Sequence, residues 1–264
     1  ERVGRDETQT EAMPRATEPR VDSRGAVQRR VRGNAATASM VRFDAAKDPV
    51  VRLEPLATLG ESLGLFRRHI SAGGTTGGRL DVADFEREEF VVTEPGVVIE
   101  IFAADHLGDA IARLYARHAE LLPEGPDRQR AEVTARALAY ILTDSVTPDA
   151  TSLLFSPSYE DIDHRSVGYG KLSTDEATKL AVSQRALAAD LRFRVEDILA
   201  LRPDGLVRRT TTSGTWREGG GAFERTICML PLFGPDGRAA RQETFDSDRE
   251  AEAHVHPRRV RLDR

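Results

Sequence analysis

Apolar residues in the second half of the chain recur with helical and strand periods. A helix over residues 128–142 has one apolar face, formed by Ala131, Ala135, Leu138, Ile141 and Leu142. Thr147-Pro148 is typical of a helix start. Ser173-Thr174-Asp175-Glu176 reads as a capping box. The helix that it opens carries on one face Ala177, Leu180, Ala181, Gln184 and Leu187.

Strand-like runs surround this second helix. A short strand over residues 159–165 precedes it, and four more runs follow, beginning at Arg192, Leu206, Ala222 and Arg238. The turns are predicted at Pro203-Asp204-Gly205, Glu218-Gly219-Gly220-Gly221 and Pro235-Asp236-Gly237. Helices, a strand, a helix and then an antiparallel meander form an α+β order, which differs from βαβ repetition.

Runs in the first half match this pattern at sequence offsets between 138 and 143. The matched runs pair 21–24 with 162–165, 52–54 with 194–196, 65–68 with 206–209, 85–87 with 223–225 and 100–102 with 243–245. Five matches in one order indicate two diverged copies of one unit. The first copy begins in mid-unit and the chain opens on Glu1, so we expect a piece of a longer protein.

The repeat divides the chain into five expected segments. They are an arginine-rich lead-in of little order over 1–32, a truncated first repeat over 33–104, a connecting helix capped by Asp105 with a Pro/Gly joint over 105–126, a complete second repeat over 127–255, and a basic tail over 256–264. The connecting helix has an apolar stripe of Leu107, Ala110, Ile111, Leu114, Tyr115 and Leu122. We expect residues 127–255 to fold alone.

This element order, with Asp163-His164-Arg165 on the first strand, resembles the SnoaL-like group, which shares the cone fold of nuclear transport factor 2. The runs 101–108, 112–115 and 220–225 resemble the tandem carboxyl-terminal segments of large actinobacterial regulators that carry nucleotide-cyclase-like or ATPase modules. The resemblance implies tandem α+β cones, each a strongly bent antiparallel sheet wrapped around helices, with a tapering cavity. It also implies a deep acid/base aspartate from a later strand in the cyclases, and no residue here matches it.

The composition of the chain excludes several classes of partner and site. The net charge of −5 gives no general attraction to phosphate, so we expect no nucleic-acid binding. Only Cys228 is present, which excludes an internal disulfide and favours a reducing, cytoplasmic location. No apolar run approaches the ~20 residues of a membrane span. We expect no cofactor.

Asp163, His164 and Arg165 are the first candidates for chemistry. Alternation places Asp163 and Arg165 on one strand face and His164 on the other. Either Asp163 or His164 could act as acid/base, with Arg165 as an anion clamp. The alternative is a structural Asp–Arg pair, which the first copy favours because it keeps Asp22 and Arg24 but has Ser23.

Other candidates are ligand contacts. Tyr169 and Trp216 adjoin glycines and could line the cavity or its rim. We expect Arg208 and Arg209 to lie on the outer face of the sheet or to pair with Glu196. The matching residues of the first copy, Arg67 and Arg68, are expected to lie on the outer face or to pair with Glu54. His254 and His256 have no evident third ligand, so we expect no metal site.

Two functions remain open from these observations. The first is a non-catalytic module that senses a small apolar ligand, or mediates homodimerisation or pairing of the repeats, for upstream domains of a regulatory protein. The alternative is a SnoaL-like cyclase, isomerase or hydrolase that acts on a small, fairly apolar substrate.

Overall fold

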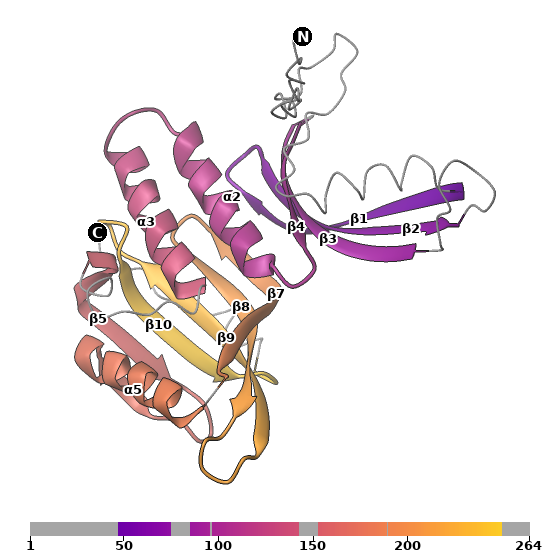
Figure 1. The fold of residues 1–264 in the computed structure, drawn as a ribbon. Helices are drawn as coiled ribbons and strands as arrows, with labels where there is room; N and C mark the ends of the chain where they lie inside the picture. Colours follow the sequence, from indigo (N-terminus) through magenta and orange to yellow (C-terminus); the bar gives the residue numbers. More distant parts are fainter. Residues whose placement is uncertain (1–46, 75–84, 96, 143–152, 189, 250–264) are drawn as a thin grey trace, which may run out of the picture.

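The computed structural model describes residues 47–74, 85–95, 97–142, 153–188 and 190–249. Within these ranges the chain forms two sheets and three α-helices (Figure 1). The arrangement is α+β, as the element order predicts, and the sheets are long and bent, as the resemblance implies (Figure 1). The lead-in, the tail, Thr147-Pro148, and His254 and His256 lie outside the described residues.

The first sheet is an antiparallel meander in chain order that projects away from the helices (Figure 1). Opposite charges face each other across its strands, because Glu54 lies opposite Arg67 and Arg68 lies opposite Glu89. Both pairs form ion pairs, and the pairing of Arg67 with Glu54 confirms a prediction. Such pairs help to fix strand register. The strands are β1 (Lys47–Leu59), β2 (Leu63–Gly73), β3 (Phe85–Glu94) and β4 (Val97–Ala103).

Two antiparallel helices follow and pack side by side, and the first of them lies against the first sheet (Figure 1). They are α2 (Leu107–Leu121) and α3 (Pro126–Leu142). The predicted apolar stripe of α2 is buried. Asp105 does not cap this helix, which is a correction: the N-cap is His106, whose Nδ1 lies 2.5 Å from Asp109 Oδ2.

The second sheet has the strand order β6-β5-β10-β9-β8-β7. Its four-strand meander repeats the order of the first sheet, which confirms the order predicted for the two matching segments. One pairing differs from the antiparallel expectation, because β5 runs parallel to β10. The elements are β5 (Phe155–Asp163), β6 (Gly170–Ser173), α5 (Thr174–Leu187), β7 (Arg192–Arg202), β8 (Gly205–Thr215), β9 (Ala222–Phe233) and β10 (Ala239–Asp246).

One apolar cluster joins both sheets through α2. It contains side chains from the first sheet, from α2, from α3 and from the β7–β8 hairpin, among them Leu65, Phe90, Ile111, Leu114, Leu138, Ile198 and Leu206. The buried Tyr115 hydroxyl lies 2.5 Å from the carbonyl oxygen of Arg202 and 3.1 Å from that of Gly205, beside the β7–β8 turn. Helix α2 therefore packs as a shared layer.

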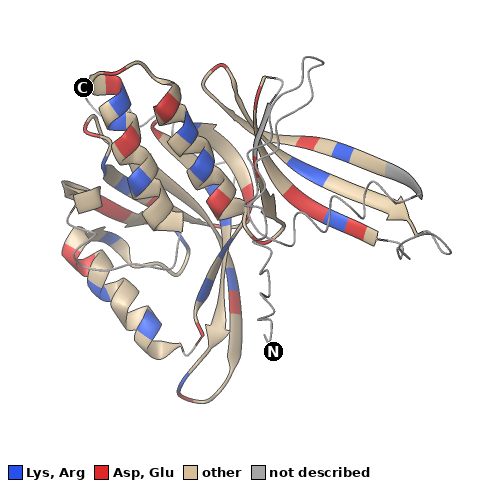
Figure 2. Cartoon of the chain, turned by 45° about the horizontal axis from the view of Figure 1, so that its top comes forward, with Lys and Arg blue, Asp and Glu red and all other residues tan. Residues whose placement is uncertain are grey.

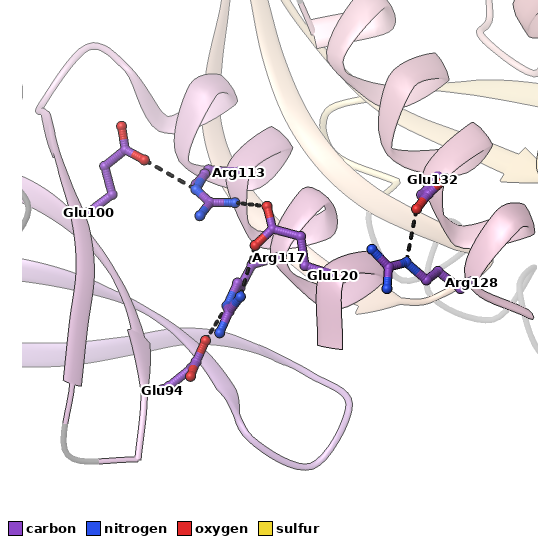
Figure 3. A network of polar contacts seen from close by, with 7 residues as sticks. All are labelled: Glu94, Glu100, Arg113, Arg117, Glu120, Arg128 and Glu132. Carbon is purple, nitrogen blue, oxygen red and sulfur yellow. Dashed lines mark hydrogen bonds and ion pairs between the residues drawn. The ribbon is translucent and has the colours of Figure 1, made fainter. Parts of the chain in front are cut away.

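Ion pairs strengthen the contact between α2 and the first sheet (Figure 3). Arg113 contacts Glu100 of β4 at 3.2 Å and Glu120 at 3.0 Å. Arg117 contacts Glu94 of β3 and, at 2.9 Å, the same Glu120. Glu120 thus links two arginines, each of which reaches a different strand. Figure 2 shows acidic and basic residues alternating along α2 and α3.

Candidate functional site: a cavity under the second sheet

The concave face of the second sheet encloses a cavity of about 430 Å³ with α5 and the end of α3. The capping box that starts α5 is present, with the Ser173 backbone N–H donating to Glu176. The helix face predicted from the sequence lines the cavity. Most of the lining is apolar or aromatic and includes Ile141, Phe155, Leu172, Ala177, Leu180, Ala181, Leu187, Phe193, Val195, Phe223, Ile227 and Met229.

Strand β5 contributes two carboxylates to this cavity, because Asp161 and Asp163 share one face of the strand. Asp163 accepts hydrogen bonds from Arg165 Nε at 2.6 Å, Arg165 Nη2 at 2.5 Å and the Tyr169 amide at 3.0 Å. Burial opposes ionisation of Asp163, but these donors outweigh it and hold the pKa of the carboxyl below its ordinary value. Asp163 and Arg165 therefore form a neutralised pair that anchors the loop after β5.

Asp161 has a different electrostatic environment. Burial raises the pKa of its carboxyl to about 6, the negative charge of Asp163 adds to the rise, and Arg165 opposes it. A carboxyl with such a pKa exchanges a proton near neutral pH, which suits a general acid or base. Asp161 is not among the residues predicted from the sequence, although its position two residues before Asp163 places it on the same strand face.

Arg208 lies in the floor of the cavity on β8 and is 3% exposed. Its Nη2 lies 3.7 Å from the Met229 sulfur on the neighbouring strand. Among the described residues, its Nε and Nη1 have no hydrogen-bond partner, and neither has Oγ1 of Thr210, two positions along the same strand face. Burial lowers the pKa of Arg208 to about 10, so the guanidinium stays charged at neutral pH.

This position corrects the expectation that Arg208 faces outward. Adjacent residues on a strand point to opposite faces, so only one of Arg208 and Arg209 can do so. Arg209 takes the outer position and contacts Asp197 at 3.5 Å, where we expected Glu196. Register shifts between β7 and β8, at Val195/Asp197 and Ile198/Ala200, place Asp197 opposite Arg209.

Tyr169 and Trp216 lie at the exposed margin of the cavity, where the sequence predicted ligand contacts or rim residues. Trp216 is 42% exposed and stacks on Phe223 with ring centroids 4.3 Å apart. Tyr169 is 53% exposed, and the guanidinium carbon of Arg165 lies 5.8 Å from its ring centroid. Both rings offer flat surfaces to a molecule that enters.

His164 does not line the cavity. It lies on the opposite face from Asp163, as strand alternation predicts. Its Nε2 is 2.9 Å from Oε2 of the buried Glu243, and its ring stacks on Phe245 at 4.6 Å between centroids. These contacts fit a structural role at the outer face, so the geometry gives His164 no access to a ligand in the cavity.

Within the described ranges no group of three His, Cys, Asp or Glu side chains could hold a metal ion. Cys228 is buried in β9, as predicted. None of the helices described is long and apolar enough to span a membrane.

No protein-family model matches this chain, and no curated protein matches it significantly. Among solved structures it is similar to BvnE pinacolase from Penicillium brevicompactum, at 14% identity over 54% of this chain and 99% of that chain, with a TM-score of 0.38. It is also similar to PrhC from Penicillium brasilianum, at 10% identity over 51% of this chain and 93% of that chain, with a TM-score of 0.36. A third similar structure is a hypothetical protein with a ketosteroid isomerase-like fold from Catenulispora acidiphila. Its identity is 16% over 44% of this chain and 84% of that chain, and the TM-score is 0.34. Other matches are described as NTF2-like and SnoaL-like.

Proposed function

We propose that the second sheet and its helices form a binding module for a small, largely apolar molecule. The observation that carries this proposal is the cavity of about 430 Å³ with its mostly apolar lining. This volume lies within the range of about 300–1,000 Å³ that is usual for small-molecule sites.

A sensing role within a longer regulatory protein extends this proposal. Helix α3, which contributes Tyr140, Ile141 and Leu142 to the cavity, packs along α2. Helix α2 in turn packs against the first sheet. A ligand that repositions α3 therefore has a packed route to the first sheet, and we infer that this route serves the upstream domains expected from the sequence.

Binding is tested with N-phenyl-1-naphthylamine, a neutral probe that fluoresces in apolar surroundings. We expect saturable binding at one site per chain. Ala181→Phe fills the cavity and is expected to weaken binding at least about tenfold, since the added ring occupies ligand volume. Val182→Phe is the matched control, because Val182 is the next residue on α5 and is 53% exposed. Equal binding by both variants would contradict the proposal.

An enzyme is the second candidate, and the raised pKa of Asp161 favours it. A base with a pKa near 6 beside an apolar cavity is suited to removing a proton next to a carbonyl group. The test is hydrogen–deuterium exchange of 2-tetralone at its α-carbon, followed by NMR in D₂O. Exchange that the wild-type protein accelerates and Asp161→Asn does not would support this candidate; equal rates with both proteins and with buffer would exclude this reaction.

A further inference from the structure

We propose that the molecule bound in the cavity is an apolar monocarboxylate whose carboxylate group is held by the Arg208 guanidinium. This inference rests on the proposed binding function and names the chemical class of the ligand. The floor of the cavity contains a buried charge. Arg208 is 3% exposed, and buried charges in proteins are normally paired.

The protein itself supplies no counter-ion to Arg208 from the described lining. The lining carboxylates are Asp161 and Asp163, both on β5, whereas Arg208 is on β8. Strands β10 and β9 lie between them, which separates the backbones by roughly 14 Å along the sheet at about 4.8 Å per strand. Asp163 is in addition fully engaged by Arg165.

The hydrogen-bond donors of Arg208 and Thr210 that have no partner among the described residues indicate which chemical group a ligand would place beside them. Nε and Nη1 of Arg208 have no hydrogen-bond partner among the described residues. They lie on different edges of the guanidinium, and Nη2, which is 3.7 Å from the Met229 sulfur, completes both edges. Either edge fits a carboxylate with two parallel hydrogen bonds. The Thr210 hydroxyl, also without a partner there, adds one more donor on the same face. A single buried cation matches a single negative charge, and this argues against a phosphate dianion.

The other residues that line the cavity indicate the chemical character of the rest of the ligand. Around Arg208 the lining includes Met229, Ile227 and Val195, which favour hydrocarbon. Four arginines and two aspartates line the cavity. Arg165 is paired with Asp163, and among the four arginines only Arg208 is buried, so one guanidinium supplies the uncompensated charge in the floor. A small apolar acid with one carboxylate fits this combination of shape and charge.

The experiment compares each acid with its neutral amide in the full chain. The probes are 1-naphthylacetate and decanoate, with 1-naphthylacetamide and decanamide as isosteric controls, each measured by displacement of N-phenyl-1-naphthylamine. For the wild type we expect at least one acid to bind about tenfold or more tightly than its amide. In Arg208→Met that ratio is expected to fall to about one, while amide affinity changes by less than about threefold.

Three further variants separate the possible causes. Arg208→Gln repeats the test with a polar side chain. Thr210→Val is expected to weaken acid binding by about threefold, because it removes one donor and keeps the shape. Arg209→Gln is the matched control on the outer face, and we expect it to leave the acid-to-amide ratio unchanged.

The outcomes distinguish this inference from the binding function itself. If acids and amides displace the probe equally well from the wild type, the cavity binds apolar molecules and the carboxylate inference is wrong. If the preference for acids persists in both Arg208 variants, another group holds the anion and the inference is also wrong. If the fluorescent probe itself does not bind, the binding function fails as well.

Discussion

Arg208 carries a guanidinium that water would solvate better than the floor of the cavity does. A charge in low dielectric without a counter-ion destabilises the folded state, and residues that do so are commonly retained at functional sites. In the ligand-free protein, this cost is present without compensation. A bound anion would remove it, so the same residue links ligand binding to stability.

We therefore expect Arg208→Met to stabilise the ligand-free protein. Methionine fills a similar volume without a charge, and replacing buried ionic groups with apolar ones often adds about 1–4 kcal/mol to the free energy of unfolding. Urea denaturation at pH 7 measures the change. Arg209→Met, on the outer face beside Asp197, should change the free energy of unfolding by less than about 0.5 kcal/mol. A lower stability for Arg208→Met would indicate that the guanidinium is paired in the folded protein.

The raised pKa of Asp161 predicts that its contribution to the free energy of unfolding falls as the pH rises, whereas that of a paired carboxylate rises. Its folded pKa, raised by burial to about 6, exceeds the ordinary value of 3.8, so the folded state binds more protons between these values. Stability contributed by this group is present below about pH 4 and is lost as the pH rises through 6. Asp161→Asn removes the titrating group and should be more stable than the wild type at pH 8 by about 1–3 kcal/mol.

The measurement for Asp161 is the free energy of unfolding at pH 4.5, 6 and 8. We expect the advantage of Asp161→Asn to shrink steadily towards pH 4.5. Asp163 contributes with the reverse sign, because its pKa is lowered and its stabilisation disappears only as the pH falls below the ordinary value of 3.8. An advantage of Asp161→Asn that does not change with pH would contradict the assignment.

At the scale of elements, α2 is the piece on which both sheets depend. Its apolar face contributes to the cluster that joins them, and its Tyr115 hydroxyl contacts the carbonyl oxygens of Arg202 and Gly205. Burial raises the pKa of Tyr115 well above its ordinary value, so the hydroxyl remains a donor at every working pH. Arg113 and Arg117 attach the other side of the helix to β4 and β3 (Figure 3).

Tyr115→Phe tests this anchor. The change removes one hydroxyl from a fully buried position and leaves two carbonyl oxygens without that donor, which should lower the free energy of unfolding by about 1–3 kcal/mol. Tyr169→Phe is the control, because Tyr169 is 53% exposed and its loss of a hydroxyl should cost less than about 0.5 kcal/mol. Equal effects would mean that the Tyr115 hydroxyl adds nothing beyond its ring.

Elements set by local chemistry could be predicted from the sequence, and features set by distant pairing could not. The Ser173–Glu176 capping box and the turn at Gly237, whose φ is +79°, depend on neighbouring residues and follow the prediction. The inward position of Arg208 depends on which face of β8 lines the cavity, and only the assembled sheet and helices decide this. The pairing of Arg209 with Asp197 depends on register shifts against β7, which no local pattern reveals. Asp161 could have been found from the alternation that placed Asp163, but its raised pKa arises from burial under α5 and α3, which only the assembled fold supplies.

At the scale of the whole molecule, the division into units determines which fragments fold. The sequence pattern predicts that residues 127–255 fold alone. In the structure, α2 packs on α3 and contacts β7, so a fragment that begins at Asp127 lacks Leu107, Ile111 and Leu114 from its core. The loss of such side chains costs about 2–5 kcal/mol each in well-packed cores.

We expect a fragment of residues 105–264 to unfold cooperatively in urea and a fragment of residues 127–264 to be much less stable. Circular dichroism and the midpoint of the urea transition compare the two fragments. The full chain provides the reference, and it should be more stable than both because the first sheet covers the other side of α2. Equal midpoints for the two fragments would show that α2 belongs only to the first sheet.

The parallel pairing of β5 with β10 has a consequence for how the protein is made. It joins the first strand of the second sheet to the last, and His164 contacts Glu243 across 79 positions of sequence. During synthesis β5 leaves the ribosome long before its partner exists, at about 5–20 residues per second. For several seconds a nascent chain therefore exposes a strand edge beside the unfinished cavity. The cavity can close only when translation has passed β10, so a ribosome that pauses within β8 or β9 presents a chain suited to chaperone binding or to pairing with a neighbouring chain.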